Sequence, residues 1–576
     1  MITNTELEKK GNLFPTKLVS YEQNGDSICF TSENAVQLII TVVRDSMLRF
    51  RYATDGIFEK DFSYAIDEDQ PHGYSVMDIT EDDEFIWIIT EQIKCRITRK
   101  DMRTALFDIE DQLILQDELG FHWEESFEFG GNYVKMSKTT VDGENFYGLG
   151  DKPTSFNLKG KRISNWNTDQ YAFSKDLDEL YKAIPFYIGL HSAKAYGIFF
   201  DNTFKTHFDF CHERRHVTSF WADGGEMNYY FIYGPKIADV VTKYTNLTGR
   251  PELPPMWALG YHQSKWSYYP EAKVKELAAN FRDNKFPCDA LYLDIDYMDG
   301  FRCFTWNKDY FPEPKRMVEE LERDGFKTVA IIDPGIKIDN KYEIFKDGLE
   351  KDYFCRRADG PYMQGKVWPG NCVFPDFTNP KAREWWADHY KTLIAEIGIK
   401  GIWNDMNEPA VMEVPGKTFP LDVRHDYDGN RCSHRKAHNV YGMQMARATY
   451  EGVKKYIFPK RPFTITRASY SGGQRFSSTW TGDNLASWEH LWLANIQIQR
   501  LGMSGFSFAG TDIGGFADQP TGELFTRWIQ LGVFHPFCRV HSSGDHGEQE
   551  PWYFGEEVLE ITRKFVELRY QLLPYL

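Results

Sequence analysis

From residue 256 onward the chain alternates short apolar runs with longer amphipathic segments, and this alternation restricts the fold more than any other feature. The runs that we expect to form strands are 257–261, 290–293, 328–332, 399–403, 463–466, 479–482, 506–509 and 534–538. Most are followed by apolar residues at helical spacing, as Val274, Leu277 and Phe281 show within 270–284. Eight strands that alternate with helices predict a closed parallel (β/α)8 barrel.

The first 250 residues have a different pattern. Short β-branched and aromatic runs at 38–43, 48–52, 85–90, 93–98, 186–190, 197–202 and 228–233 indicate an N-terminal β-sandwich. A short helix is expected at 237–244, and the prolines of 251–255 mark a boundary. We therefore expect residues 1–250 to form the sandwich and 251–576 the barrel. The aromatic stretch 337–379, after the third barrel strand, is too long for an ordinary loop and is expected to be an insertion subdomain.

Composition argues against several classes of function. A formal net charge of -17 does not suit a nucleic-acid partner, which needs clustered basic residues. No apolar run reaches the length of about 18 residues that a membrane span requires. The nine cysteines are scattered without a C-x-x-C pair, which is neither a zinc spacing nor a disulfide framework. Residues 1–10 lack the apolar core of a signal peptide. We expect a reduced, cytoplasmic protein; its oligomeric state, including a homo-oligomer, stays open.

Charged side chains follow the predicted barrel strands at the point where each strand ends. They are Asp294, Asp333, Asp405, Arg467, Asp483, Asp512 and His541. Helix capping explains an isolated Asp at such a place, but not five Asp with one Arg and one His. The carboxyl ends of barrel strands share one mouth, where catalytic groups of this fold lie. Aromatic residues are expected around the same mouth at Trp368, Trp403, Trp480 and Phe516.

A pocket of carboxylates and indole rings suits a neutral polyhydroxylated ligand. Carboxylates accept hydrogen bonds from hydroxyls, and a Trp face covers the C–H face of a pyranose. Cleavage of a glycosidic bond requires two carboxyl groups, one ionised and one protonated at neutral pH because its pKa is raised. The sequence therefore predicts a glycoside hydrolase that needs no metal or organic cofactor.

Two segments carry a resemblance to a known family. The segment WNDMNEP at 403–409 resembles the nucleophile signature of glycoside hydrolase family 31, the α-glucosidase family, and WTGDN at 480–484 resembles its acid/base segment. This resemblance implies that Asp405 is the nucleophile and Asp483 the general acid and base. It also implies two displacements, retention of the α configuration, and a separation of about 5–5.5 Å between the two carboxyl groups.

The same resemblance implies the residues that bind substrate. They are Asp169, Trp266, Asp294, Ile295, Ile336, Trp368, Trp403, Met406, Arg467, Trp480, Asp512, Phe516 and His541. Asp169 belongs to a segment, 166–169, that resembles the loop by which the sandwich reaches the active site. A Trp at position 266 is similar to the residue found there in isomaltase-type members of the family, which prefer α-1,6 bonds. The segment DIDYM at 294–298 is retained, which favours glucosides over α-xylosides.

The expected function is a retaining, exo-acting α-glucosidase that acts on α-glucoside oligosaccharides. Within the family an α-glucosyltransferase or an α-galactosidase is the alternative. From another class, a non-catalytic carbohydrate-binding protein would keep the fold, although the presence of both Asp405 and Asp483 argues against it.

Overall fold

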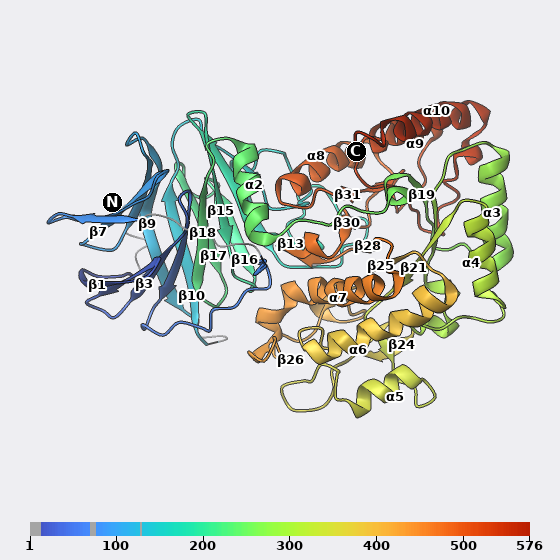
Figure 1. Cartoon of the computed structure of the whole chain (residues 1–576), viewed down its shortest axis with the longest axis horizontal. Coiled ribbons are helices and arrows are strands. Elements are labelled where there is room, and N and C mark those ends of the chain that lie inside the picture. The colour runs from blue at the N-terminus through green and yellow to red at the C-terminus, as the bar shows by residue number, and fades with distance from the viewer. Residues whose placement is uncertain (1–12, 70–76, 127–129) are drawn as a thin grey trace.

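The structure is a computed structural model that describes residues 13–69, 77–126 and 130–576; the expectation about residues 1–10 lies outside this part of the chain. Two bodies lie side by side (Figure 1): a layered β-region formed by the first part of the chain, and a ring of strands and helices formed by the rest. Helix α2 (Ile237–Thr248) lies on the side of the β-region that faces the ring.

The N-terminal part is a sandwich of two sheets, as predicted. The eight-stranded sheet has the order β1 (Leu18–Asn24), β2 (Ser27–Ser32), β3 (Gln37–Arg44), β4 (Met47–Ala53), β18 (Met227–Tyr233), β15 (Lys194–Phe200), β14 (Phe186–His191), β11 (Asn145–Gly148). The nine-stranded sheet has the order β12 (Arg162–Asn165), β16 (Thr206–Phe210), β17 (Val217–Ala222), β10 (Asn132–Thr139), β9 (Leu113–Glu125), β8 (Thr104–Asp108), β7 (Ile93–Thr98), β6 (Phe85–Ile89), β5 (Asp78–Glu81).

Alternation of side chains explains why these runs form a two-layered body. In β2 and β6, every second residue is buried, which is the pattern of strands with one face on a core. Ile28, Phe30, Ile86 and Ile88 belong to one apolar cluster that lies between the sheets. The seven runs predicted from the sequence all lie in strands of this sandwich.

The second part is a barrel of parallel strands that closes through a divided strand. The sheet order is β31 (Ala509–Gly510), β30 (Ser478–Trp480), β28 (Thr464–Thr466), β25 (Gly401–Asn404), β21 (Lys327–Ile332), β20 (Ala290–Leu293), β19 (Tyr261–Gln263), β33 (Cys538–Val540), β32 (Asp512–Ile513). β31 and β32 are consecutive in the chain and pair with opposite ends of the sheet, β30 and β33. They act as two halves of the seventh strand, so the predicted (β/α)8 topology is confirmed.

Helices surround the barrel strands (Figure 1). They are α3 (Glu271–Asp283), α4 (Pro314–Arg323), α6 (Pro380–Lys391), α7 (His434–Ile457), α8 (Trp488–Met503), α9 (Gly522–Gly532) and α10 (Glu556–Leu572). α6 begins as its sequence predicts: the Asn379 side chain accepts a hydrogen bond from the Lys381 N–H, and Pro380 occupies the first turn, where a missing N–H costs nothing.

The stretch after the third barrel strand forms an insertion with a small sheet of its own. Its strands are β22 (Ile336–Lys337), β24 (Gly370–Val373) and β23 (Gln364–Val367), and its helix is α5 (Glu343–Glu350). A two-stranded piece, β26 (Arg424–His425) with β27 (Cys432–Ser433), precedes α7. Among the described residues, no helix is both long enough and apolar enough to cross a membrane.

Three predicted barrel strands were displaced along the chain. Residues 506–508, predicted as the start of the seventh strand, lie outside it, and pairing occurs only at Ala509–Gly510 and Asp512–Ile513. Residues 257–259, predicted as the start of the first strand, lie in a 3-10 turn (Met256–Leu259), and pairing begins only at Tyr261. The Trp257 ring instead packs edge-on against Phe463 at 5.0 Å, so its apolar surface covers the barrel end. Residues 534–537 also lie outside the eighth strand, because Pro536 has no N–H for the ladder and pairing starts at Cys538.

Candidate active site

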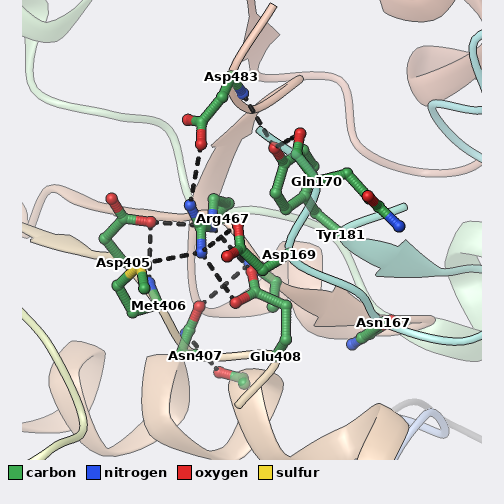
Figure 2. A network of polar contacts seen from close by, with 12 residues as sticks. Asn167, Asp169, Gln170, Tyr181, Asp405, Met406, Asn407, Glu408, Arg467 and Asp483 are labelled. Carbon is green, nitrogen blue, oxygen red and sulfur yellow. Dashed lines mark hydrogen bonds and ion pairs between the residues drawn. The ribbon is translucent and has the colours of Figure 1, made fainter. Parts of the chain in front are cut away.

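One buried guanidinium joins the two carboxyl groups that the sequence singles out (Figure 2). Arg467 lies directly after β28, and its side chain is 2% exposed. Its Nε lies 2.9 Å from Asp405 Oδ1 and 2.8 Å from Glu408 Oε1. Its Nη1 lies 3.4 Å from Asp483 Oδ2. A single cation therefore faces three acids in a space that water hardly reaches.

Strand pairing explains why these residues meet. β25 pairs with β28 so that Asn404 lies opposite Thr466, and Asp405 and Arg467 are the next residues along the two strands. β28 pairs with β30, which brings Asp483 to the same edge three residues after its strand ends. Parallel strands place their carboxyl ends on one rim, so a residue just past the end of each strand points into the barrel mouth.

The sandwich contributes two more groups to this centre. Asp169, from the segment 166–169, places Oδ1 3.3 Å from Arg467 Nη2. The Tyr181 ring lies 4.9 Å from the guanidinium carbon, and its hydroxyl accepts a hydrogen bond of 3.2 Å from the Asp483 N–H. Both are drawn beside Arg467 in Figure 2. The expected reach of this loop into the barrel mouth is therefore present in the structure.

The two central carboxyl groups have unequal environments. Burial raises the pKa of Asp405, but the Arg467 Nε and the Met406 N–H, which donates to Oδ1 at 2.8 Å, oppose this shift. Burial raises the pKa of Asp483 well above its usual range; Arg467 opposes the shift from a longer distance, and the Asp405 charge adds to it. Asp405 is thus the better-stabilised anion, and Asp483 is the carboxyl group whose pKa is raised further.

Two further acids lie at the ends of neighbouring strands. Asp294 follows β20 and accepts a hydrogen bond of 2.7 Å from the Ile295 N–H. Asp333 follows β21, and its Oδ1 has no hydrogen-bond partner among the described residues. Burial raises the pKa of both well above the usual range, and the nearby Asp405 charge adds to each shift. Burial and mutual repulsion therefore raise the pKa of several carboxyl groups at this rim.

Aromatic rings form one wall of the mouth. Trp403 packs edge-on against Trp480 at 5.8 Å and against His541 at 5.0 Å, and His541 stacks on Phe516 at 4.9 Å. His541 Nδ1 lies 2.8 Å from the Ser264 hydroxyl, and burial lowers its pKa well below the usual range, so the ring is neutral. Three of the predicted aromatic residues, Trp403, Trp480 and Phe516, thus form one chain of ring contacts with His541.

Asp512 lies in β32, and a second buried arginine holds it there. Its Oδ1 lies 2.7 Å from Arg539 Nη2, and neither side chain is exposed. The guanidinium of Arg539 also lies 4.9 Å from the Trp403 ring and 5.0 Å from the Trp480 ring. Burial raises the pKa of Asp512 to about 7 despite this partner. Asp512 therefore braces the aromatic wall through Arg539.

The other predicted site residues lie around this centre. Trp266 and Trp368 contact each other with ring centroids 5.0 Å apart. Ile295 and Ile336 are buried at the ends of β20 and at β22. Met406 contacts Arg467 directly, since its sulfur lies 3.2 Å from Nη2.

Three contributing residues were missed or undervalued in the sequence. Glu408, which the sequence does not distinguish from a supporting residue of the strand end, binds Arg467 through both oxygens, at 2.8 and 2.9 Å. Arg539 is a charged residue between two apolar residues of the last strand, Cys538 and Val540. A charge within a buried strand is unusual, and that pattern could have identified Arg539 as a site residue. Tyr181 belongs to an irregular stretch, 166–181, in which no periodicity marks its position.

One group among the described residues has side chains suited to a metal ion: Cys355, Asp376 and His425, all buried. The Asp376 carboxylate already accepts hydrogen bonds from His425 Nδ1 at 3.0 Å, from the Thr378 hydroxyl at 2.6 Å and from the Asp426 N–H at 2.7 Å. Its lone pairs are therefore used within the protein, and we assign no metal to it.

A (β/α)8 barrel whose mouth holds two buried carboxyl groups of unequal pKa has the fold and the site of a glycoside hydrolase. Residues 251–576 match the glycosyl hydrolases family 31 TIM-barrel domain, and residues 37–209 match the glycosyl hydrolase 31 N-terminal galactose mutarotase-like domain. The chain belongs to glycoside hydrolase family 31.

Individual relatives agree with this assignment. Alpha-glucosidase 2 of Bacillus thermoamyloliquefaciens is 42% identical over 500 residues, which are 86% of this chain and 62% of that protein. Neutral alpha-glucosidase AB of Homo sapiens is 36% identical over 499 residues, which are 80% of this chain and 52% of that protein. The chain thus spans less than two thirds of either relative.

A solved structure extends the likeness to the whole fold. The Flavobacterium johnsoniae family 31 dextranase complexed with isomaltotriose has a TM-score of 0.91 and 32% identity, over 98% of this chain and 69% of that chain. The glucosidase II alpha subunit has a TM-score of 0.87 and 27% identity, over 98% of this chain and 70% of that chain.

Proposed function

We propose that this protein is a retaining, exo-acting α-glucosidase that releases terminal α-linked glucose from oligosaccharides. The observation that carries the proposal is that Arg467 contacts both Asp405 and Asp483, but lies closer to Asp405 (2.9 Å) than to Asp483 (3.4 Å). A retaining glycosidase needs one anionic and one protonated carboxyl group on either side of the scissile bond. The printed names of the relatives, two alpha-glucosidases and a dextranase, support the same substrate class.

The mechanism assigns one role to each carboxyl group. Asp405 attacks the anomeric carbon while Asp483 gives its proton to the leaving oxygen, and a covalent glucosyl-enzyme forms. Asp483, now ionised, removes a proton from water, which attacks the anomeric carbon and releases Asp405. Two inversions retain the α configuration. We expect the two carboxyl groups to lie about 5–5.5 Å apart, as retention requires.

The remaining groups are proposed to bind the glucose unit. Asp294, His541 and Asp169 offer hydrogen bonds to its hydroxyls, while Arg467 holds the catalytic pair. Trp403, Trp480 and Phe516 form the wall against its C–H faces, together with the apolar side chains of Ile295, Ile336, Trp368 and Met406. Asp512 supports this wall through Arg539, which lies 4.9 Å from the Trp403 ring.

We also propose that α-1,6 bonds are preferred. Trp266 follows the first barrel strand and contacts Trp368, so the two rings form a platform beside the pocket. Two adjoining indole rings, here tilted 60° to one another, offer apolar faces to an extended α-1,6-linked unit on the leaving-group side. The structurally similar dextranase, which was solved with isomaltotriose, supports this preference.

Hydrolysis of a panel of substrates tests the proposal. We expect release of glucose from isomaltose, maltose, nigerose and kojibiose, with the highest kcat/KM for isomaltose, and turnover of p-nitrophenyl α-glucoside above that of the α-galactoside. Faster turnover of the galactoside would reject the assignment in favour of an α-galactosidase. Longer saccharides as the main products would indicate a glucosyltransferase, and no turnover of any substrate would indicate a binding protein.

Two wider features remain proposals. We propose that residues 1–250 and 251–576 are the two domains, since β18 and α2 end the first and the barrel begins after the prolines of 251–255. We also propose a cytoplasmic location, because all nine cysteines are free thiols, as in a reducing compartment.

A further inference from the structure

Three buried histidines form an unbroken row of hydrogen bonds beside the active site. His438 Nε2 lies 2.7 Å from the Asn167 carbonyl oxygen, and His438 Nδ1 lies 2.8 Å from His434 Nε2. His434 Nδ1 lies 2.9 Å from His425 Nε2, and His425 Nδ1 lies 3.0 Å from Asp376 Oδ1. All three rings are at most 2% exposed. The row joins the end of the insertion to the segment 166–169 of the sandwich.

Counting protons fixes the direction of this row. Its two ends, a carboxylate and a backbone carbonyl, can only accept hydrogen bonds, so its four bonds need four protons. Three neutral imidazole rings carry three. The group therefore holds one extra proton. Burial lowers the pKa of His434 well below its usual range and that of His438 to about 3, so these two rings are neutral.

The extra proton then lies between His425 and Asp376. The pKa of Asp376 is held below its usual value because His425 and other donors outweigh burial, so the carboxylate is ionised and accepts the hydrogen bond from His425 Nδ1. Each ring consequently donates from Nε2 toward the next, and His438 donates to the Asn167 carbonyl. The Thr418 hydroxyl lies 3.4 Å from both His434 Nε2 and His438 Nδ1, and it can accept or donate without reversing this direction.

The far end of the row holds a loop in place. The Trp166 ring stacks on the His438 ring with centroids 3.7 Å apart and planes 12° apart. The neighbouring Asn439 accepts a hydrogen bond of 3.0 Å from the Asn167 N–H through its side chain and one of 3.1 Å from Asn167 Nδ2 through its carbonyl. α7 thus fixes both the ring and the backbone of this loop.

Two residues further along the same loop, Asp169 places its carboxylate 3.3 Å from Arg467 Nη2. The same guanidinium also forms ion pairs with Asp405 and Asp483. A shift of the loop would therefore change both a proposed glucose ligand and the charge balance of the catalytic pair.

We propose that His438 is a positioning residue, and that the row His438–His434–His425–Asp376 holds Asp169 in the active site by donating a hydrogen bond to the Asn167 carbonyl. The inference rests on the proposed function, because it uses Asp169 as a substrate-binding residue. It also gives the insertion after the third barrel strand a role, since Asp376 lies near its end and anchors the row.

A double-mutant cycle tests the coupling. We expect His438→Phe, which keeps a ring against Trp166 but removes the N–H, to lower kcat/KM for maltose about tenfold, the factor that corresponds to one hydrogen bond. In the Asp169→Ala background the same change is expected to have no further effect. Additive losses, or an unchanged kcat/KM in His438→Phe, would overturn the proposal.

Two further variants separate positioning from folding. His535→Phe is the matched control: its ring is also buried and has no hydrogen-bond partner among the described residues, so kcat/KM should not change. His438→Gln retains an N–H at a similar reach, and we expect it to recover most of the lost activity. If His438→Phe is unstable, His438→Gln can replace it in the cycle, measured both in the parent protein and in Asp169→Ala. Any loss of kcat/KM that His438→Gln causes in the parent protein should then be absent in Asp169→Ala.

The protonation pattern has its own spectroscopic signature. In protein with 15N-labelled histidine, we expect His434 and His438 to be neutral with the proton on Nε2, and His425 to be doubly protonated, at pH 7. Assignment uses the spectra of the single His→Phe variants. A neutral His425, or a proton on Nδ1 of His438, would contradict the row. Failure of the parent protein to hydrolyse any α-glucoside would instead refute the proposed function and leave this result standing.

Discussion

Arg467 divides its contacts unequally between the two carboxyl groups that flank it. Its Nε contacts Asp405 at 2.9 Å, whereas Asp483 is reached only by Nη1 at 3.4 Å. Asp483 thus receives less compensation for its burial, and its pKa is raised further than that of Asp405. Glu408 occupies the rest of the Nε edge. The proposed division of labour between nucleophile and acid therefore follows from where one guanidinium points.

Replacing Asp483 should affect substrates according to their leaving group. We expect Asp483→Ala to lower kcat for maltose by about 10²–10⁴-fold, the usual contribution of general acid–base catalysis. α-Glucosyl fluoride needs no proton on its leaving group, so its first step should lose far less, and added azide should yield α-glucosyl azide. Asp405→Ala should abolish turnover of both substrates. Equal losses for maltose and the fluoride in Asp483→Ala would contradict the assignment.

Removing the Asp169 charge should move the pH profile. The Asp169 carboxylate raises the pKa of both Asp405 and Asp483. Activity requires ionised Asp405, which sets the acid limb, and protonated Asp483, which sets the alkaline limb. In Asp169→Asn both pKa values fall, so both limbs of the profile of kcat/KM against pH should shift to lower pH. This shift is expected even if the maximal kcat/KM decreases.

A matched charge removal provides the control for this shift. Asp388→Asn removes a carboxylate from an exposed ion pair with Lys455, far along α6, and both limbs should stay where they are in the parent protein. Limbs of Asp169→Asn that stay fixed, or that move to higher pH, would contradict the electrostatic account.

The turn after β30 depends on a glycine. Gly482 has φ +79°, and a Cβ there would overlap the Tyr181 ring that contacts Arg467 and the Asp483 N–H. Gly482→Ala should therefore displace Tyr181 and Asp483 and lower kcat/KM by about 10²-fold, as an error of about 1 Å in catalytic geometry does. Steady-state kinetics on p-nitrophenyl α-glucoside measures the loss.

A second glycine separates backbone strain from collision. Gly160 has φ +80° but no atom within 4 Å of an added Cβ. Gly160→Ala should cost about 1 kcal/mol of folding free energy from the left-handed backbone and leave kcat/KM unchanged. Similar activities of the two variants would show that the Tyr181 contact is dispensable.

Barrel strands whose residues are all buried could be predicted from the sequence, whereas strands that pair over only two residues could not. β20 and β25 are buried at every residue, so their apolar runs stand out in the sequence. β31 and β32 pair over two residues each, and no composition signal distinguishes such pieces from loops. Asp294, Asp333 and Asp405 could be predicted at strand ends because each follows a clear, buried strand.

The site residues that the sequence did not indicate depend on contacts between distant segments. Tyr181 reaches Asp483 from the sandwich, and only the packing of two domains brings them together. Likewise, nothing in the spacing of His425, His434 and His438 predicts a continuous row, since β26, β27 and the start of α7 must first fold against one another.

The contact between the two domains includes a fully buried cation. β13 (Lys182–Ala183) pairs in parallel with β29 (Ser469–Tyr470) of the barrel region. Lys182 Nζ lies 2.7 Å from Asp151 Oδ2 and donates a hydrogen bond of 2.6 Å to the Trp480 carbonyl oxygen, and neither charged side chain is exposed. This contact ties the sandwich to the strand that carries Asp483.

Removing one charge of this pair should destabilise the assembly of the two domains. Lys182→Met leaves the Asp151 carboxylate buried without its partner, so we expect a loss of about 3–5 kcal/mol in the free energy of unfolding by urea. Lys182→Met/Asp151→Leu removes both charges and should recover most of that loss. Lys455→Met, which breaks an ion pair with both side chains more than half exposed, should cost less than about 1 kcal/mol. Equal stability of Lys182→Met and Lys455→Met would show that the buried pair does not hold the domains together.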